Sequence, residues 1–165
     1  MSTTPAPASH EKMLEYLREC IQVAKRARSM DYHPFGSILV EDATGKVLLQ
    51  HGNFGPVFHA ESELARVAAL NFKPEFLRKC TLYTSVEPCV MCSGACYWAN
   101  IGTIVYAMPG AELEPLTKDS KECPKMELTC REVFSRGSRK ANVIGPFPEL
   151  YDEVLADHYG YWENH

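Results

Sequence analysis

Two short segments of this sequence carry side chains that bind transition metals. His59-Ala60-Glu61 lies where a glycine-containing loop enters a predicted helix, and Pro88-Cys89-Val90-Met91-Cys92 lies where a predicted strand enters the next helix. Two thiolates and one imidazole suit Zn²⁺, and three protein ligands leave the fourth tetrahedral position open to water. The two segments therefore predict a zinc site of the catalytic type, with His59, Cys89 and Cys92 as ligands.

Glu61 indicates what such a site does. A structural zinc site has no use for a carboxylate two residues from a ligand, whereas a hydrolytic site needs a group that takes a proton from water and passes it to the substrate. Cys89 and Cys92 are three residues apart, so both sulfurs face one side of a first helical turn. A helix N-terminus also stabilises negative charge and favours thiolates there.

Cys96 leaves a second interpretation open. It lies on the same predicted helical face as Cys89 and Cys92, and as a fourth ligand it would close the site into a structural Cys₃His centre. The other interpretation is a small buried apolar residue one turn deeper in the core. The first case predicts a zinc module without enzymatic activity, and the second predicts an enzyme.

The elements that position these residues follow from the hydrophobic pattern. Apolar residues at three- and four-residue steps predict a helix over 12–29, with Ser9 as its N-cap, and a helical tail from Glu149 onward. Short apolar runs and turn residues predict the other elements, which are helices 60–72 and 88–99 and strands 36–40, 46–50, 81–85, 103–107 and 142–144. Residues 111–137 show no clear pattern beyond a short helix over 128–134.

This order of elements predicts the fold class and the domain organisation. We expect a single three-layer α/β/α domain, with a central mixed sheet of about five strands flanked by helices. A length of 165 residues favours one core. We assign residues 1–10 to a flexible lead-in, because Pro5 and Pro7 oppose helix, and residues 11–165 to the domain.

Composition narrows the partners and the compartment. The formal net charge of −4 argues against a protein that mainly grips a nucleic-acid backbone, which needs a basic face. The sequence contains no run of eighteen apolar residues, so we expect no membrane-spanning segment. Seven cysteines without a recognisable secretory signal favour a reducing compartment, and we expect the cytoplasm.

The paired motifs resemble the cytidine deaminase-like superfamily, whose signature is H-x-E followed by P-C-x-x-C. The stretch from Cys80 to Ala107 and the segment Pro34-Phe35-Gly36 look like the guanine deaminase and tRNA adenosine deaminase branch. The resemblance implies zinc as cofactor, with Glu61 as proton shuttle, and a homodimer. It also implies that Asn53 hydrogen-bonds the base or the sugar; the alternative is a turn residue before Gly55.

The tail, residues 157–165, is unusually aromatic. Resemblance to guanine deaminases implies a lid that closes over the base and is exchanged between dimer subunits; alternatively, Tyr159 and Trp162 complete the core or an interface. The weaker candidates for contacts with the substrate are Asn53, Ala60, Glu112, Asp119, Tyr161 and Trp162.

A lid favours a small base or nucleoside over a tRNA loop, and our first expectation is hydrolysis of guanine to xanthine and ammonia. Guanine deaminases have a second acid after the strand corresponding to 103–107, but Glu112, Glu114 and Asp119 do not match its register. Cytosine, isocytosine and a triazine therefore stay open as substrates. The tRNA adenosine deaminase is a separate alternative.

Overall fold

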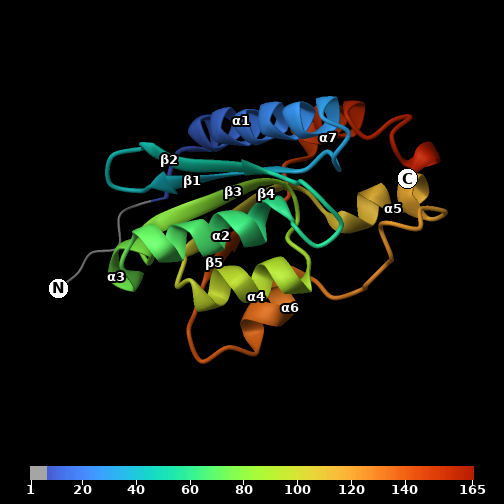
Figure 1. Ribbon diagram of the computed structural model, residues 1–165. Helices are drawn as coiled ribbons and strands as arrows, with labels where there is room; N and C mark the ends of the chain where they lie inside the picture. The colour runs from blue at the N-terminus through green and yellow to red at the C-terminus, as the bar shows by residue number, and fades with distance from the viewer. Residues whose placement is uncertain (1–6) are drawn as a thin grey trace.

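Five strands form one mixed sheet in the computed structural model, which describes residues 7–165 (Figure 1). The spatial order is β2-β1-β3-β4-β5. The first pairings, β1 with β2 and β1 with β3, are antiparallel, whereas β3, β4 and β5 run parallel. The strands are β1 (Gly36–Glu41), β2 (Val47–Gly52), β3 (Cys80–Val86), β4 (Thr103–Met108) and β5 (Asn142–Ile144).

Helices cover both faces of the sheet and confirm the predicted three-layer architecture. Helices α1 and α7 lie on one face, and α2, α4 and α6 lie on the other (Figure 1). The helices are α1 (His10–Ser29), α2 (Ala60–Asn71), α3 (Pro74–Leu77), α4 (Val90–Trp98), α5 (Glu114–Thr117), α6 (Cys130–Ser135) and α7 (Tyr151–Ala156). Within residues 7–165, no helix combines the length and the apolarity that crossing a bilayer requires.

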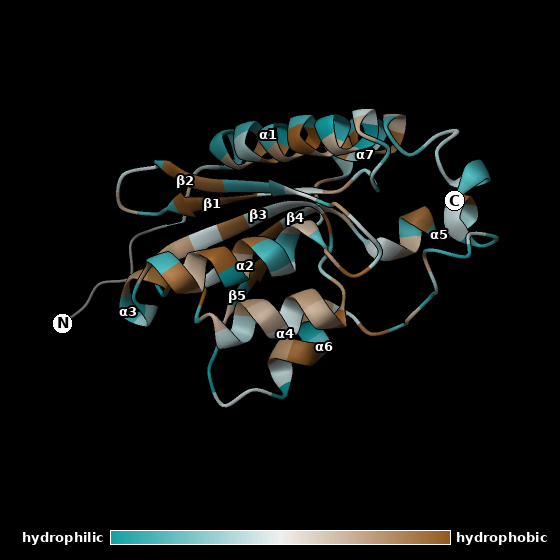
Figure 2. Cartoon of the chain, viewed as in Figure 1, coloured by the Kyte–Doolittle hydropathy of each residue, from teal (hydrophilic) through white to brown (hydrophobic). Residues whose placement is uncertain are grey.

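Helix α1 shows why the pattern predicts its position well. Ser9 is its N-cap, with its Oγ accepting a hydrogen bond from Lys12 N at 3.2 Å, as expected. Buried residues such as Leu17 and Ile21 face the sheet, and the helix alternates between polar and apolar colours in Figure 2. A Cβ on Gly36 would lie 2.3 Å from Cys20 O, so only glycine lets β1 start this close beneath α1.

Several predicted boundaries differ from the structure by one or two residues, and those of α4 and α1 are the most informative. The helix expected to open at Pro88 begins at Val90, because Pro88 and Cys89 precede it and Cys89 has extended backbone angles as the N-cap. At the other end of the chain, α1 starts at His10, and Ala8 packs against the core. Residues 1–6 of the predicted lead-in lie outside the described part of the chain.

Candidate metal centre

The starts of two helices bring the predicted ligands together. His59 is the N-cap of α2 and Cys89 is the N-cap of α4, and these two helices pack side by side on one face of the sheet. His59 Nδ1 lies 3.6 Å from Cys89 Sγ and 3.5 Å from Cys92 Sγ. The three donor atoms all lie within 4.8 Å of one another. The structure therefore makes one cluster of residues that are about thirty positions apart in sequence.

These separations fit a tetrahedral zinc ion. Zn–N bonds of about 2.0–2.1 Å and Zn–S bonds of about 2.3 Å at a tetrahedral angle place N and S roughly 3.6 Å apart. His59 Nε2 lies 3.0 Å from Pro56 O. Donation of the Nε2 proton to that carbonyl leaves the Nδ1 lone pair facing the two sulfurs, as a ligating histidine requires.

The charges in the cluster also suit a divalent cation. A hydrogen bond from Cys92 lowers the pKa of Cys89 well below its usual value, and the neighbouring imidazole adds to the effect. The Cys89 sulfur and burial together raise the pKa of Cys92, while the hydrogen bond with Cys89 raises the pKa of His59 to about 8. The cluster by itself thus favours one thiolate, and a bound divalent cation would stabilise the second.

Glu61 lies beside the ligands on the first turn of α2, and its side chain is buried. Thr84 Oγ1 donates a hydrogen bond to Glu61 Oε1 at 2.6 Å, and Cys92 Sγ lies 3.4 Å from Oε2. Burial raises the pKa of Glu61, and the hydrogen bond from Thr84 opposes that change. A carboxylate held in one orientation with a raised pKa is suited to accept and return a proton.

Thr84 is a site residue that the sequence analysis missed. It lies in β3, where all seven residues are buried, and its hydroxyl also lies 3.1 Å from Val86 O. A hydroxyl inside a fully buried strand needs a polar partner. That requirement is the signal available in the sequence, although the sequence alone does not identify Glu61 as the partner.

Glu87 directly precedes the ligand segment and connects it to two other elements. Its Oε1 accepts a hydrogen bond from Cys130 N, the first residue of α6, at 3.0 Å. Its own N–H donates to Met108 O at 2.8 Å. Glu87 therefore ties the start of the ligand segment to both β4 and α6.

Asn53 follows β2 and is 2% exposed. Its Oδ1 accepts a hydrogen bond from Gly55 N at 2.9 Å, which is the turn interaction we considered. Its Nδ2 has no hydrogen-bond partner among the described residues. The turn therefore leaves a buried amide donor free for another acceptor.

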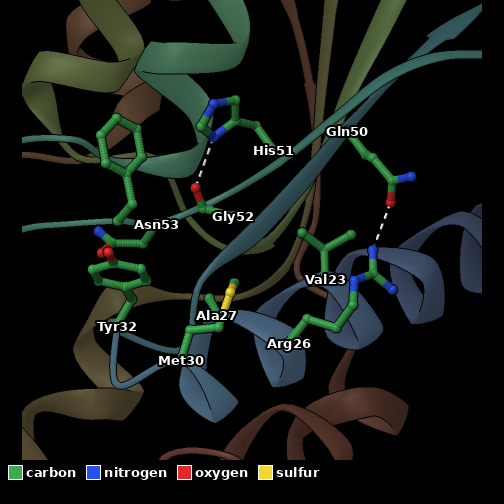
Figure 3. A pocket seen from close by; sticks show the side chains of 10 residues that line it. Val23, Arg26, Ala27, Met30, Tyr32, Gln50, His51, Gly52 and Asn53 are labelled. Atoms are coloured by element: carbon green, nitrogen blue, oxygen red, sulfur yellow. Dashed lines mark hydrogen bonds between the residues drawn. The ribbon is translucent and has the colours of Figure 1, made fainter.

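A surface hollow of about 270 Å³ lies between the end of α1 and β2 (Figure 3). Asn53 is part of its lining, and Arg26 and Gln50 join across it by a hydrogen bond of 2.6 Å. None of the three clustered donors lines this hollow. The hollow therefore does not contain the metal-binding donors.

The other candidate residues occupy three different surroundings. Cys96 is fully buried among the apolar residues of α2, α4 and α6, and the donor cluster contains His59, Cys89 and Cys92 without it. Ala60 is the buried first residue of α2. Glu112 and Asp119 are exposed and lie outside the cluster, so the structure does not bring them to the ligands as a second acid.

The aromatic tail folds back onto its own chain. Tyr161 and Trp162 are buried, and the Trp162 ring lies 4.9 Å from that of His33 and 6.1 Å from that of Phe35. Trp162 Nε1 donates a hydrogen bond to His158 Nδ1 at 3.2 Å. The two tail residues among the candidates for contact with the substrate thus take part in packing within the chain.

Comparison with known families identifies the cluster. The family model described as the cytidine and deoxycytidylate deaminase zinc-binding region matches residues 10–108, which include all three ligands and Glu61. The chain belongs to this family. Zinc is therefore the metal that His59, Cys89 and Cys92 bind in this deaminase.

Individual relatives of this deaminase differ in how much of the chain they match. A protein described as a probable cytosine deaminase of Schizosaccharomyces pombe is 40% identical over 157 residues, which are 93% of this chain and 94% of the relative. A guanine deaminase of Bacillus subtilis is 41% identical over 78 residues, 45% of this chain and 49% of the relative. The chain spans about half of that second relative.

Solved structures agree on the fold of the deaminase. A guanine deaminase from Nitrosomonas europaea superimposes with a TM-score of 0.72 at 23% identity and covers 96% of this chain and 88% of its own. A structure from work on A-to-I editing by tRNA:A34 deaminases gives 0.62 at 21% identity, over 87% and 99%. Identities this low support the three-layer fold alone.

Proposed function

We propose that this protein is a zinc-dependent hydrolase that deaminates a free nucleobase. The observation that carries the proposal is the placement of a buried carboxylate, Glu61, beside three donor atoms with tetrahedral zinc spacing. In the reaction, water adds to the ring carbon that bears the exocyclic amine, the carbon–nitrogen bond breaks, and a carbonyl and ammonia form. Zinc, when bound by His59, Cys89 and Cys92, supplies Lewis-acid activation of water.

Glu61 is the proton carrier in this proposal. Its carboxylate takes a proton from the attacking water and delivers it to the ring nitrogen. It then takes the remaining proton from the added hydroxyl and passes it to the departing amine, which leaves as ammonia. Thr84 donates to Oε1 and so leaves Oε2, which is on the side of Cys92, for these transfers. The role of Thr84 is to orient Glu61 and not to contact the base.

Asn53 and Ala60 are proposed to hold the base. The free Nδ2 donor of Asn53 matches a ring carbonyl oxygen, because its Oδ1 is already engaged by Gly55. Ala60 begins α2, and N–H groups in the first turn of a helix have no acceptor within the helix. Both donors suit the oxygen of cytosine better than the ring of adenine, which has no carbonyl group.

Cytosine is the substrate that the observations favour. The probable cytosine deaminase matches 93% of this chain, whereas the guanine deaminase of Bacillus subtilis matches 45%. Glu112 and Asp119, our candidates for the second acid that guanine deaminases use, are exposed. Guanine stays the second candidate, because its deaminase from Nitrosomonas europaea has a similar fold over 96% of this chain.

A panel of amines tests both choices. Ammonia release is measured with cytosine, guanine, isocytosine, a triazine, cytidine and adenosine, and inosine is measured in tRNA. We expect the highest kcat/KM with cytosine and no inosine in tRNA. A higher kcat/KM with guanine would overturn the substrate, and tRNA editing without activity on free bases would overturn the class of substrate. The same experiment with Cys96→Ala excludes a closed four-ligand site if activity persists.

The zinc-bearing face also fits a homodimer. Leu70 of α2 is 86% exposed and Trp98 of α4 is 85% exposed, and Val67 lies on the exposed side of α2. Apolar side chains gathered on two adjacent helices are typical of an interface between copies of one chain. Light scattering after gel filtration should give twice the mass of one chain. For Leu70→Glu, we expect the mass of a single chain. Exchange of tails is not required, because each tail docks on its own chain.

A further inference from the structure

Three segments from distant parts of the sequence meet at the carboxylate of Glu122. His33, in the loop between α1 and β1, has its Nε2 2.9 Å from Glu122 Oε2. His165, at the end of the tail, has its Nδ1 3.7 Å from the same oxygen. Ser120 Oγ donates a hydrogen bond to His165 O at 2.9 Å. Glu122 thus joins the 31–35 loop, the 120–122 turn and the tail.

The histidine side of this network is buried. His33 is 5% exposed, and its ring packs between those of Tyr161 at 6.0 Å and Trp162 at 4.9 Å. Burial of an imidazole is costly unless its nitrogens are hydrogen-bonded, and Glu122 satisfies Nε2. The hydrogen bond with His33 lowers the pKa of Glu122, which indicates that the pair stabilises the carboxylate.

One contact connects the network to the residue proposed to bind the base. Phe35 O accepts a hydrogen bond from Asn53 N at 3.1 Å, so the 31–35 loop supports the residue proposed to bind the base.

We infer that Glu122 is a positioning residue that latches the tail and the 120–122 turn onto the 31–35 loop, and thereby fixes Asn53 for the base. The assignment of Asn53 rests on the proposed function, whereas the latch itself does not. The competing account is that the packing of Trp162 holds the tail without help from Glu122.

A single-tryptophan reporter separates the two accounts. The sequence has two tryptophans, and Trp98 is 85% exposed while Trp162 is 5% exposed. In a Trp98→Phe background, quenching by acrylamide therefore reports the docking of the tail alone. The variants are Glu122→Ala, Glu122→Gln and His165→Ala, with Glu127→Ala as the matched control. Glu127 is a glutamate of the same loop whose side chain is 77% exposed and pairs with Lys125.

We expect Glu122→Ala to raise the quenching constant of Trp162 several-fold, His165→Ala to raise it less, and Glu127→Ala to leave it unchanged. Glu122→Gln should recover most of the protection, since its amide oxygen still accepts from His33. With cytosine, KM of Glu122→Ala should rise roughly 10-fold, the scale of one charge-assisted hydrogen bond. Its kcat and zinc content should stay near those of the parent.

Two outcomes overturn the latch. One is a Trp162 that remains as protected in Glu122→Ala and His165→Ala as in the parent. The other is a KM effect of equal size in Glu127→Ala. If the tail opens as expected but no base in the panel is deaminated by the parent, the latch stands and the proposed function fails, so the two failures are distinguishable.

Discussion

The metal cluster and the docked tail solve the same problem, holding side chains in place, by different means. At the cluster, His59 and Cys89 are the caps of two helices packed on the sheet, so backbone geometry sets the spacing of the donor atoms. At the tail, Glu122 is 43% exposed and the contacts join loops. The difference teaches that the donor atoms are fixed by regular elements, whereas the position of the tail depends on side-chain hydrogen bonds and packing between loops.

Removal of a zinc ligand should have the largest effect. Cys92→Ala leaves two donors, so we expect zinc content to fall below a tenth of the parent's and ammonia release to drop below detection, because metal binding and ligand set are coupled. Elemental analysis and the ammonia assay measure both. The control is Cys96→Ala on the same helix, which should lower thermal stability but retain zinc. If Cys92→Ala loses zinc and Trp162 also becomes more accessible to acrylamide, the metal cluster and the tail are not independent of each other.

Glu61→Gln should come next. Its kcat should fall by about 10²–10⁴-fold, the usual contribution of a general acid–base group, while zinc is retained. Because Glu61 does not supply a donor to the cluster, zinc content separates this variant from the ligand variant. Undiminished ammonia output would reject the proton carrier.

Thr84→Val should have a smaller effect of the same kind. Loss of a hydrogen bond to a charged group costs about 1.5–3 kcal/mol, so kcat should fall roughly 10- to 100-fold with little change in KM. Thr84→Ser keeps the hydroxyl and should restore kcat. A defect of equal size in the serine variant would mean that Thr84 acts through packing and not through Glu61.

The smallest effect is a pH dependence confined to the tail. Burial, together with the charges of Arg28 and His33, lowers the pKa of His158 to about 3, below the value near 6.5 of an unfolded histidine. Since the unfolded tail binds a proton that the docked tail excludes, docking should weaken as pH falls below about 6.5, by at most about 1.4 kcal/mol per pH unit. In the Trp98→Phe background, Trp162 quenching should rise between pH 7 and 5, and His158→Gln should remove that slope.

Much of the cluster was predictable from sequence because its information is local. Cys89 and Cys92 are fixed by one helical turn, and helix and strand periods place His59 at the same edge. The five strands follow for the same reason, including the short β5. The tail was recognised as unusual from its aromatic residues, but its packing against His33 and Phe35 was not.

The parts that escaped prediction depend on pairs of side chains far apart in sequence. Thr84 and Glu61 are 23 residues apart, and His33 and Glu122 are 89 apart. The periodicity of helices and strands does not relate residues this far apart. Residues 111–137 also contain little regular structure from which their position could be predicted. The partner of Glu87, Cys130, is 43 residues away and follows a segment without a regular pattern, so the sequence does not indicate that hydrogen bond.

Glu87 has a consequence for how such proteins diversify. It anchors the strand that ends at Met108 and the helix that begins at Cys130, so both ends of the intervening stretch are pinned to the ligand segment. We expect insertions or deletions between these two anchor points to leave the metal geometry unchanged. This stretch can then vary in length and sequence among related chains without rebuilding the metal centre.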